Sequence, residues 1–131
     1  MSATSQRRRR DERGSVTIQM VFLMPALFLL MFLGLQGALY YHAKQVALAA
    51  AQEGAREAGS ETGTRESGLA TANTVLNHAG GSDVMTSTSV SGSRTTTTAT
   101  ITVTGKSLSV IPGWHVTVSQ SASVPVERLT E

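Results

Sequence analysis

The sequence predicts an α+β fold built on one long N-terminal helix that crosses a membrane. Three features indicate this fold: a charge-free apolar run over Ser15–Tyr41, an alanine-rich continuation over His42–Ala58, and an alternation of apolar and polar residues after Ser82. We expect a transmembrane helix that continues into an extracytoplasmic stalk, a second short helix, and a small antiparallel sheet of roughly three or four strands.

The apolar run is long enough to span a lipid bilayer. At about 1.5 Å per residue, its roughly 27 residues reach about 40 Å, against a hydrocarbon core of about 30 Å. A basic cluster precedes it, made of Arg7, Arg8, Arg9, Arg10 and Arg13. Because arginines that flank a first apolar segment stay in the cytoplasm, we expect a single-pass cell-membrane protein with a cytoplasmic N-terminus and an extracytoplasmic C-terminal domain.

A cleaved secretory signal is the alternative for this region. Such signals have an apolar core of about 7–15 residues followed by a small-x-small cleavage motif. The run here is longer, and Ala47-Leu-Ala, which fits that motif, lies on what is expected to be continuous helix. A retained anchor is therefore favoured.

Four segments follow from these patterns. Residues 1–14 form a basic cytoplasmic leader, 15–41 the transmembrane helix, 42–58 a helical stalk and 59–131 a small extracytoplasmic α+β domain. Pro25 lies inside the transmembrane segment, where the missing N–H predicts a helix kink. Tyr40 and Tyr41 stand at the outer end of the span, as in an interfacial aromatic belt.

In the last segment, residues 59–131, the sequence pattern predicts one helix followed by strands. A helix is expected from about Thr64 to Ala79, ended by Gly80-Gly81, with Gly59 capping the preceding helix. The alternation then predicts strands around Val84–Val90, Ile101–Val110 and Trp114–Val126, with a turn at Ile111-Pro112-Gly113. The threonine run 95–98 is expected to line a solvated strand.

Charge and motif content exclude several functions. Residues 1–14 carry five arginines against two acidic residues, a net charge of +3, whereas the rest carries six basic against seven acidic residues. A nucleic-acid-binding protein needs a basic patch on its folded part, which the near-neutral remainder lacks. The chain has no cysteine, no histidines at metal-ligand spacing, and no nucleophile or nucleotide-binding motif. We expect no enzyme activity, no cofactor, no metal and no small-molecule substrate.

Three ordered motifs resemble one known family. They are R-G-S-V-T at Arg13–Thr17, L-x-P-A-L-x-L-L at Leu23–Leu30, and A-x-E-G-A-R-E-A at Ala51–Ala58. With the basic leader that ends in Gly14, they resemble the TadE-like pseudopilins of tight-adherence (Flp-type) pili, over about residues 10–60.

The resemblance implies processing by a prepilin peptidase, an intramembrane aspartyl protease that would cut between Gly14 and Ser15. A glycine suits the scissile position because it adopts extended, close-fitting conformations easily. The implied partners are the lipid membrane, the prepilin peptidase, other pilin or pseudopilin subunits and the Tad assembly platform.

One residue departs from the family pattern. The family normally has glutamate five residues after the cut, and this chain has Gln19. A buried carboxylate there is able to pair with the terminal amine of a neighbouring subunit, whereas an amide keeps hydrogen bonding and loses the ionic attraction. We interpret the chain as a minor or initiating pseudopilin-like subunit. The alternative is an uncleaved, signal-anchored envelope protein whose outer domain binds a partner.

Overall fold

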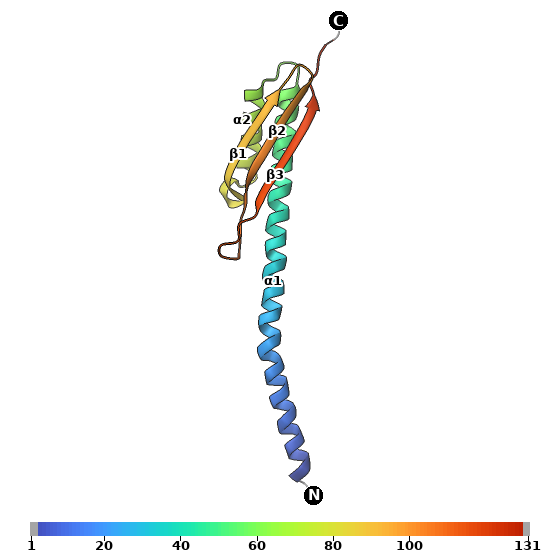
Figure 1. Cartoon of the computed structure of the whole chain (residues 1–131), viewed down its shortest axis with the longest axis vertical. Helices are drawn as coiled ribbons and strands as arrows, with labels where there is room; N and C mark the ends of the chain where they lie inside the picture. The colour runs from blue at the N-terminus through green and yellow to red at the C-terminus, as the bar shows by residue number, and fades with distance from the viewer. Residues whose placement is uncertain (1–2, 130–131) are drawn as a thin grey trace. The chain divides into compact units, whose positions relative to one another are not determined.

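The structure, a computed structural model, describes residues 3–129 and, within them, the side chains from residue 13 onward. It confirms the predicted α+β fold, with two helices and one three-stranded antiparallel sheet ordered β1-β2-β3 (Figure 1). The elements are α1 (Ala3–Gly59), α2 (Arg65–His78), the 3-10 turn η1 (Gly81–Asp83), β1 (Met85–Arg94), β2 (Thr98–Ser107) and β3 (Thr117–Pro125). The chain divides into two compact units, the first ending at Leu35 and the second beginning at Gln36.

In the first unit, the part of α1 that begins at Val16 is apolar on all sides. Its large apolar side chains from Val16 to Leu35 are exposed, with Phe22 at 74%. A helix within Arg13–Gly59 is long and apolar enough to cross a membrane by length and composition. An all-round apolar surface without a protein cover suits lipid as its surroundings, so this helix indicates a single-pass membrane anchor. Pro25 lies inside α1, and the kink expected there stays a prediction.

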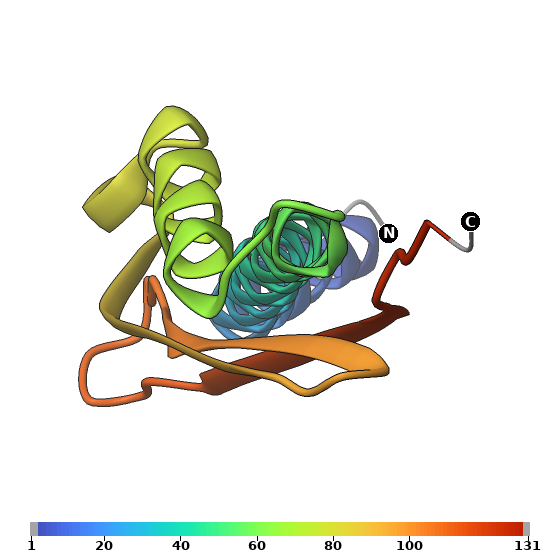
Figure 2. The same cartoon turned by 90° about the horizontal axis from the view of Figure 1, so that it is seen from above.

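In the second unit, the alanine-rich part of α1 belongs to the core. The alanines that are fully buried there are Ala43, Ala47, Ala50, Ala51, Ala55 and Ala58. Figure 2 shows this part of α1 and helix α2 side by side on one face of the sheet. The segment that we expected as a stalk therefore packs against the sheet, so that two helices cover the sheet's buried face.

The two helices meet at a pair of glycines above the middle strand. A Cβ placed on Gly54 would lie 2.8 Å from the Gly68 carbonyl oxygen and 3.2 Å from Ile101 Cγ2. A Cβ on Gly68 would lie 2.6 Å from the Ala58 Cβ. Since real Cβ atoms do not approach other atoms so closely, the crossing requires residues without side chains at both positions.

Gly54→Ala is expected to lower the free energy of unfolding of the second unit by about 1–3 kcal/mol, because the added methyl overpacks the helix crossing. Thermal unfolding of the full chain in detergent micelles, followed by circular dichroism, measures the effect. Gly37→Ala is the matched control, since a Cβ on Gly37 meets no atom within 4 Å. Equal unfolding temperatures for the two variants would contradict the tight crossing.

The sheet has one apolar and one hydroxyl-bearing face. On β2, Ala99, Ile101 and Val103 are fully buried against the helices. The alternate residues face away and pair with serines of β3 in three cross-strand hydroxyl contacts: Thr100–Ser123 at 2.7 Å, Thr102–Ser121 at 3.0 Å and Thr104–Ser119 at 3.4 Å. The sheet thus has a single buried face, as the period-two alternation of apolar and polar residues requires.

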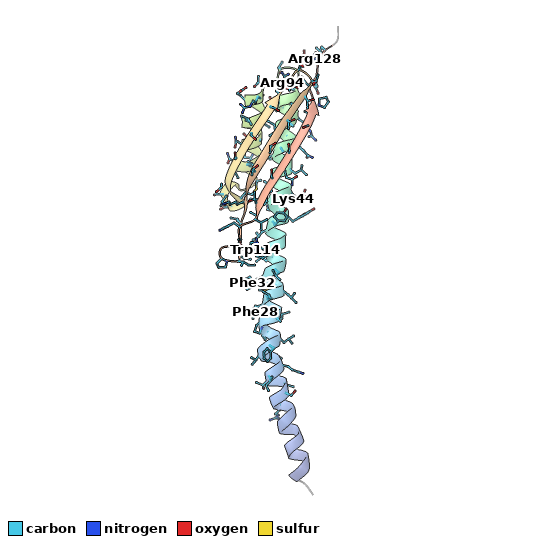
Figure 3. All side chains as sticks on the ribbon, viewed as in Figure 1. Phe28, Phe32, Lys44, Arg94, Trp114 and Arg128 are labelled. Carbon is cyan, nitrogen blue, oxygen red and sulfur yellow. The ribbon has the colours of Figure 1, made fainter. Side chains whose placement is uncertain are left out.

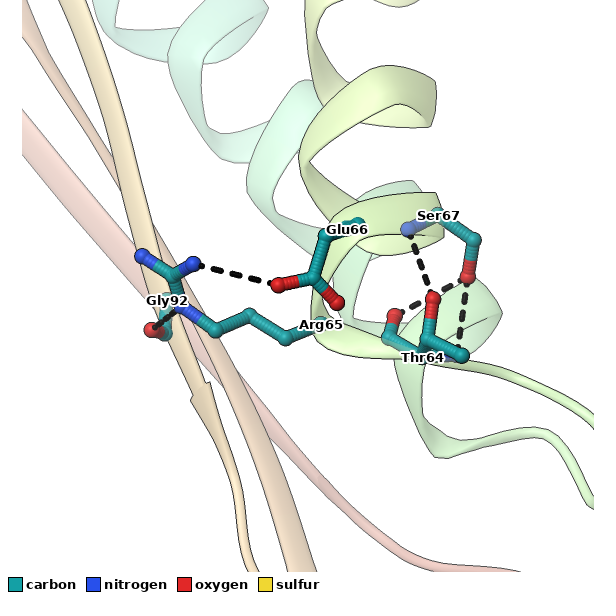
Figure 4. Close-up of polar contacts among 5 residues, drawn as sticks. All are labelled: Thr64, Arg65, Glu66, Ser67 and Gly92. Carbon is teal, nitrogen blue, oxygen red and sulfur yellow. Dashed lines mark hydrogen bonds and ion pairs between the residues drawn. The ribbon is translucent and has the colours of Figure 1, made fainter.

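Local hydrogen bonds set the ends of the helices. Helix α2 starts with a capping box, in which the Thr64 hydroxyl accepts from the Ser67 N–H and the Ser67 hydroxyl accepts from the Thr64 N–H (Figure 4). Next to it, Arg65 Nε donates to the Gly92 carbonyl of β1 at 2.7 Å. At the end of α1, Arg94 Nε donates to the Ala58 carbonyl at 2.7 Å and so binds one of the free carbonyls of the last turn.

Gly59 has a different role from the expected left-handed cap. It is the last residue of α1, and its backbone is not left-handed. A Cβ there would lie 2.6 Å from Val124 Cγ2 and 3.2 Å from the Pro125 carbonyl oxygen. Glycine is therefore needed for the close approach of the helix end to β3.

Two strand predictions are wrong in their extent. Strand β2 ends at Ser107, so Leu108 and Val110 do not continue it, and β3 begins at Thr117, so Trp114 and Val116 precede it. The expected turn is present, since the Trp114 N–H donates to the Ile111 carbonyl at 3.2 Å. Trp114 is consequently 46% exposed instead of packed on the apolar face.

The threonine run is a hairpin connection and not a strand, apart from Thr98 at the start of β2. The Thr95 hydroxyl accepts from the N–H groups of Thr97 and Thr98 at 3.3 and 3.0 Å. A side-chain hydroxyl that accepts hydrogen bonds from nearby backbone N–H groups stabilises a turn and competes with strand pairing. In this run, that effect outweighs the β-propensity of threonine.

Candidate functional site

The predicted cleavage position lies on an exposed turn of α1. Gly14 and Ser15 are both helical and exposed. A Cβ added to Gly14 would meet no atom within 4 Å, and its backbone is not left-handed. Nothing in the fold of the described residues therefore requires glycine at this position, and a requirement for it would come from another molecule.

A side-chain hydrogen bond bridges the same turn. The Thr17 hydroxyl donates to the Arg13 carbonyl at 2.9 Å, across the Gly14–Ser15 peptide bond. A hydroxyl that bonds to the carbonyl four residues earlier competes with the helix ladder and slightly destabilises or bends the helix. Gly14, Ser15 and Thr17 thus make this turn a weak point in α1.

Gln19 lies one turn further along the helix. It is exposed and borders a shallow, mostly apolar hollow with Ile18, Phe22, Leu23 and Ala26. On a helix, residues four apart are neighbours on one face, so Gln19 lies next to Ser15. The structure therefore brings the first and fifth residues after the predicted cut onto the same face.

The basic leader is described only in part. Arg13 is exposed, whereas the side chains of Arg7, Arg8, Arg9 and Arg10 lie outside the side chains that the structure describes. Among the described residues, no group of three or more histidine, aspartate or glutamate side chains gathers in a way that would hold a metal ion.

Sequence reasoning missed Gln36, the first residue of the second unit. This side chain is only 3% exposed. Its Oε1 accepts from the Val110 N–H at 3.0 Å and from the Ser109 hydroxyl at 3.1 Å, and its Nε2 donates to the Leu108 carbonyl at 3.4 Å. Gln36 therefore binds three consecutive residues of the loop between β2 and β3.

Gln36 also explains why β2 ends early. The Val110 N–H bonds to the Gln36 amide, and the Ile111 N–H bonds to the Ser109 hydroxyl at 3.1 Å, so these groups are satisfied without a partner strand. The sequence did contain a signal for this role of Gln36, because it is an isolated amide residue in an otherwise apolar run. A buried amide needs hydrogen-bond partners.

Gln36→Ala is expected to release the loop, because it leaves the Val110 N–H and the Leu108 carbonyl without their partner. The loss should cost about 1–3 kcal/mol of stability, as for buried backbone groups left unsatisfied. Hydrogen exchange of the Val110 amide in the full chain measures the release of the loop directly, and we expect this amide to exchange faster in the variant.

Asn73→Ala serves as the control, since Asn73 is exposed and, among the described residues, its side chain bonds only to the Leu69 carbonyl within its own helix. It should leave Val110 exchange unchanged. Unaltered exchange in the Gln36 variant would show that the loop is held by other contacts.

Residues 14–56 match the family model described as TadE-like protein. The predicted resemblance to the TadE-like family is therefore confirmed over this segment, which begins at the predicted cleavage site and includes Gln19, Pro25 and Gln36. No curated protein and no solved structure matches the chain.

The match indicates a protein associated with tight-adherence pili. The TadE-like family is a structural or assembly component of these pili and not an enzyme family. The apolar helix and the family match together indicate attachment to a membrane through a single pass.

Proposed function

We propose that this chain is a minor, pseudopilin-like subunit that is processed by a prepilin peptidase between Gly14 and Ser15 and takes part in the assembly of tight-adherence (Flp-type) pili or the related secretion machinery. The observation that carries the proposal is that the TadE-like match begins at Gly14, the last residue of the basic leader. We divide the chain accordingly into a leader (1–14), a transmembrane helix (15–41), a helical segment (42–58) and an outer domain (59–131).

The weak turn around Gly14 supports cleavage there. A peptidase has to unwind the helix locally before it reaches the peptide bond, and glycine lowers that cost by about 1 kcal/mol relative to alanine. The Thr17 hydrogen bond to the Arg13 carbonyl weakens the same turn. Because a Cβ at Gly14 would contact none of the described residues, the needs of the peptidase are the best explanation for the glycine.

Cleavage would change how the helix is held in the membrane. The leader carries a net charge of +3, and a basic segment is attracted to the anionic cytoplasmic leaflet. Its removal weakens that attraction and leaves an α-amino group on Ser15. The N-terminus faces the cytoplasm before cleavage, as the arginine cluster favours.

The uncovered helix suits packing against other subunits. Its large side chains from Val16 to Leu35 are exposed, and Gly34 and Gly37 leave open space on its surface. Small residues let helices approach closely in a membrane, and a Gln19 amide gains a hydrogen-bond partner when another helix packs beside it. Other pilin or pseudopilin subunits and the Tad assembly platform are the partners that we propose.

The N-terminus of the membrane-bound protein tests the proposal. Mass spectrometry should find a chain that starts at Ser15, with or without N-methylation, when the gene is expressed with its peptidase. Gly14→Val should leave Met1 or Ser2 as the N-terminus, because a branched side chain blocks the extended, close-fitting conformation at the cut.

Gly37→Val is the matched control for that variant. It also places a valine at an open position of α1, but away from the cut, and should be processed normally. An intact start in the unmodified protein would instead support an uncleaved, signal-anchored envelope protein.

Gln19→Glu tests the role as a minor subunit. The variant regains the carboxylate usual in the family and should be cleaved as before, while its incorporation into pili changes, because a carboxylate pairs with a terminal amine and an amide does not. The ratio of the chain in sheared pili to that in membranes measures incorporation. Gln19→Leu, which has neither group, is the companion variant. Loss of cleavage in Gln19→Glu would count against the assignment.

A further inference from the structure

The loop between β2 and β3, residues 108–116, has an unusual surface, and we call it the basal loop. Its apolar residues are Leu108, Val110, Ile111, Pro112, Trp114 and Val116. It contains no carboxylate, and His115 is its only titratable residue. Trp114 is 46% exposed although tryptophan is a large apolar side chain. An exposed tryptophan among apolar neighbours indicates a surface that meets something other than water.

The loop is built to present this tryptophan. The Trp114 N–H donates to the Ile111 carbonyl at 3.2 Å, which closes a four-residue β-turn. Pro112 suits the second position of such a turn, and Gly113, with a φ of +77°, supplies the left-handed third position of a type II turn. Trp114 is therefore held in place by an ordered turn.

The loop is also tied to α1. Gln36 bonds to Leu108, Ser109 and Val110, so the loop lies beside this residue of the helix. Gln36 directly follows Leu35, the last large residue of the exposed apolar run that begins at Val16. Roughly 20 helical residues span about 30 Å, the thickness of the hydrocarbon core, which brings Gln36 to the membrane boundary.

We propose that the basal loop is a second membrane contact, with Trp114 in the interfacial layer between lipid headgroups and acyl chains. Tryptophan is favoured in that layer because its ring is apolar and its N–H still finds polar partners. Tyr40, half-buried, and Tyr41, 63% exposed, lie within two turns of Gln36 and belong to the same layer. The proposal rests on insertion of the apolar helix and not on cleavage at Gly14.

The far end of the second unit has a different character. Figure 3 shows Trp114 at one end of the sheet and Arg94 and Arg128 at the other. At that end, Arg128 Nη2 donates to the Thr96 carbonyl of the threonine hairpin at 2.6 Å. The apolar loop and the polar hairpin thus occupy opposite ends, so that only the basal end is suited to lipid.

Trp114 is the only tryptophan of the chain and is therefore a direct probe. The full-length protein is reconstituted into phosphatidylcholine vesicles, and its fluorescence is quenched either by lipids brominated at defined depths or by aqueous iodide. We expect blue-shifted emission, strong quenching by bromine close to the headgroup, weaker quenching by bromine near the bilayer centre, and protection from iodide.

The matched control moves the probe to the other end of the sheet. In Trp114→Phe/Thr96→Trp, the single tryptophan lies in the hairpin, where Thr96 is exposed. This variant should be quenched by iodide and not by brominated lipid. Gln36→Ala, which releases the loop, should lose part of the lipid quenching of Trp114.

Two results would overturn the proposal. Quenching of Trp114 by iodide as efficient as in the hairpin variant would place it in water. Protection from iodide without quenching by brominated lipid would mean that a second copy of the chain covers it. Flotation of the protein with the vesicles is measured in the same samples. It reports insertion of the helix and so separates failure of the anchor from failure of the loop contact.

Discussion

The second unit depends on the close approach of α1 to α2 and to the sheet. Gly54 and Gly68 meet over Ile101 with no room for a Cβ, and six of the alanines of α1 between Ala43 and Ala58 are buried on either side. Small residues bury little area each, so their contribution depends on short distances and many contacts. The same short distances leave no room for larger side chains at the crossing. The alanine-rich composition is therefore a packing requirement, and it gives strong helix propensity as well.

Helix α1 thus carries two surfaces that suit two different environments. Up to Leu35 its large apolar side chains are exposed, as suits lipid or the helices of other subunits, and from Gln36 onward small residues face a protein core. The change from the exposed apolar surface to the core-facing surface occurs at Gln36. This residue is buried, and its amide satisfies backbone groups of the basal loop that would otherwise lack partners. A polar residue at this point ends the apolar surface and begins the folded unit.

The functional features follow the same division. The proposed cut between Gly14 and Ser15, and Gln19 beside it, lie on the exposed helix, where another protein has access to them. The basal loop lies at the start of the folded unit, where Gln36 holds it. A subunit that begins as a membrane protein and later packs into an assembly needs both a helix that other subunits can cover and an outer domain with a defined position at the membrane. The TadE-like match covers the helix, from residue 14 to 56, and includes Gln36.

The sequence by itself determined the apolar span, the two helices, the alternation of the sheet and the resemblance to TadE-like proteins, because helical and strand periodicities and motif order are local properties of the chain. Only the tertiary structure decided that residues 42–58 pack on the sheet, that Gly59 serves close packing, and that β2 ends at Ser107. These outcomes depend on residues far apart in the chain, such as Gln36 and Val110, or Gly59 and Val124. Trp114 shows the difference most clearly, because its place in an alternating pattern predicted a strand, whereas the structure places it in the basal loop, where it is 46% exposed.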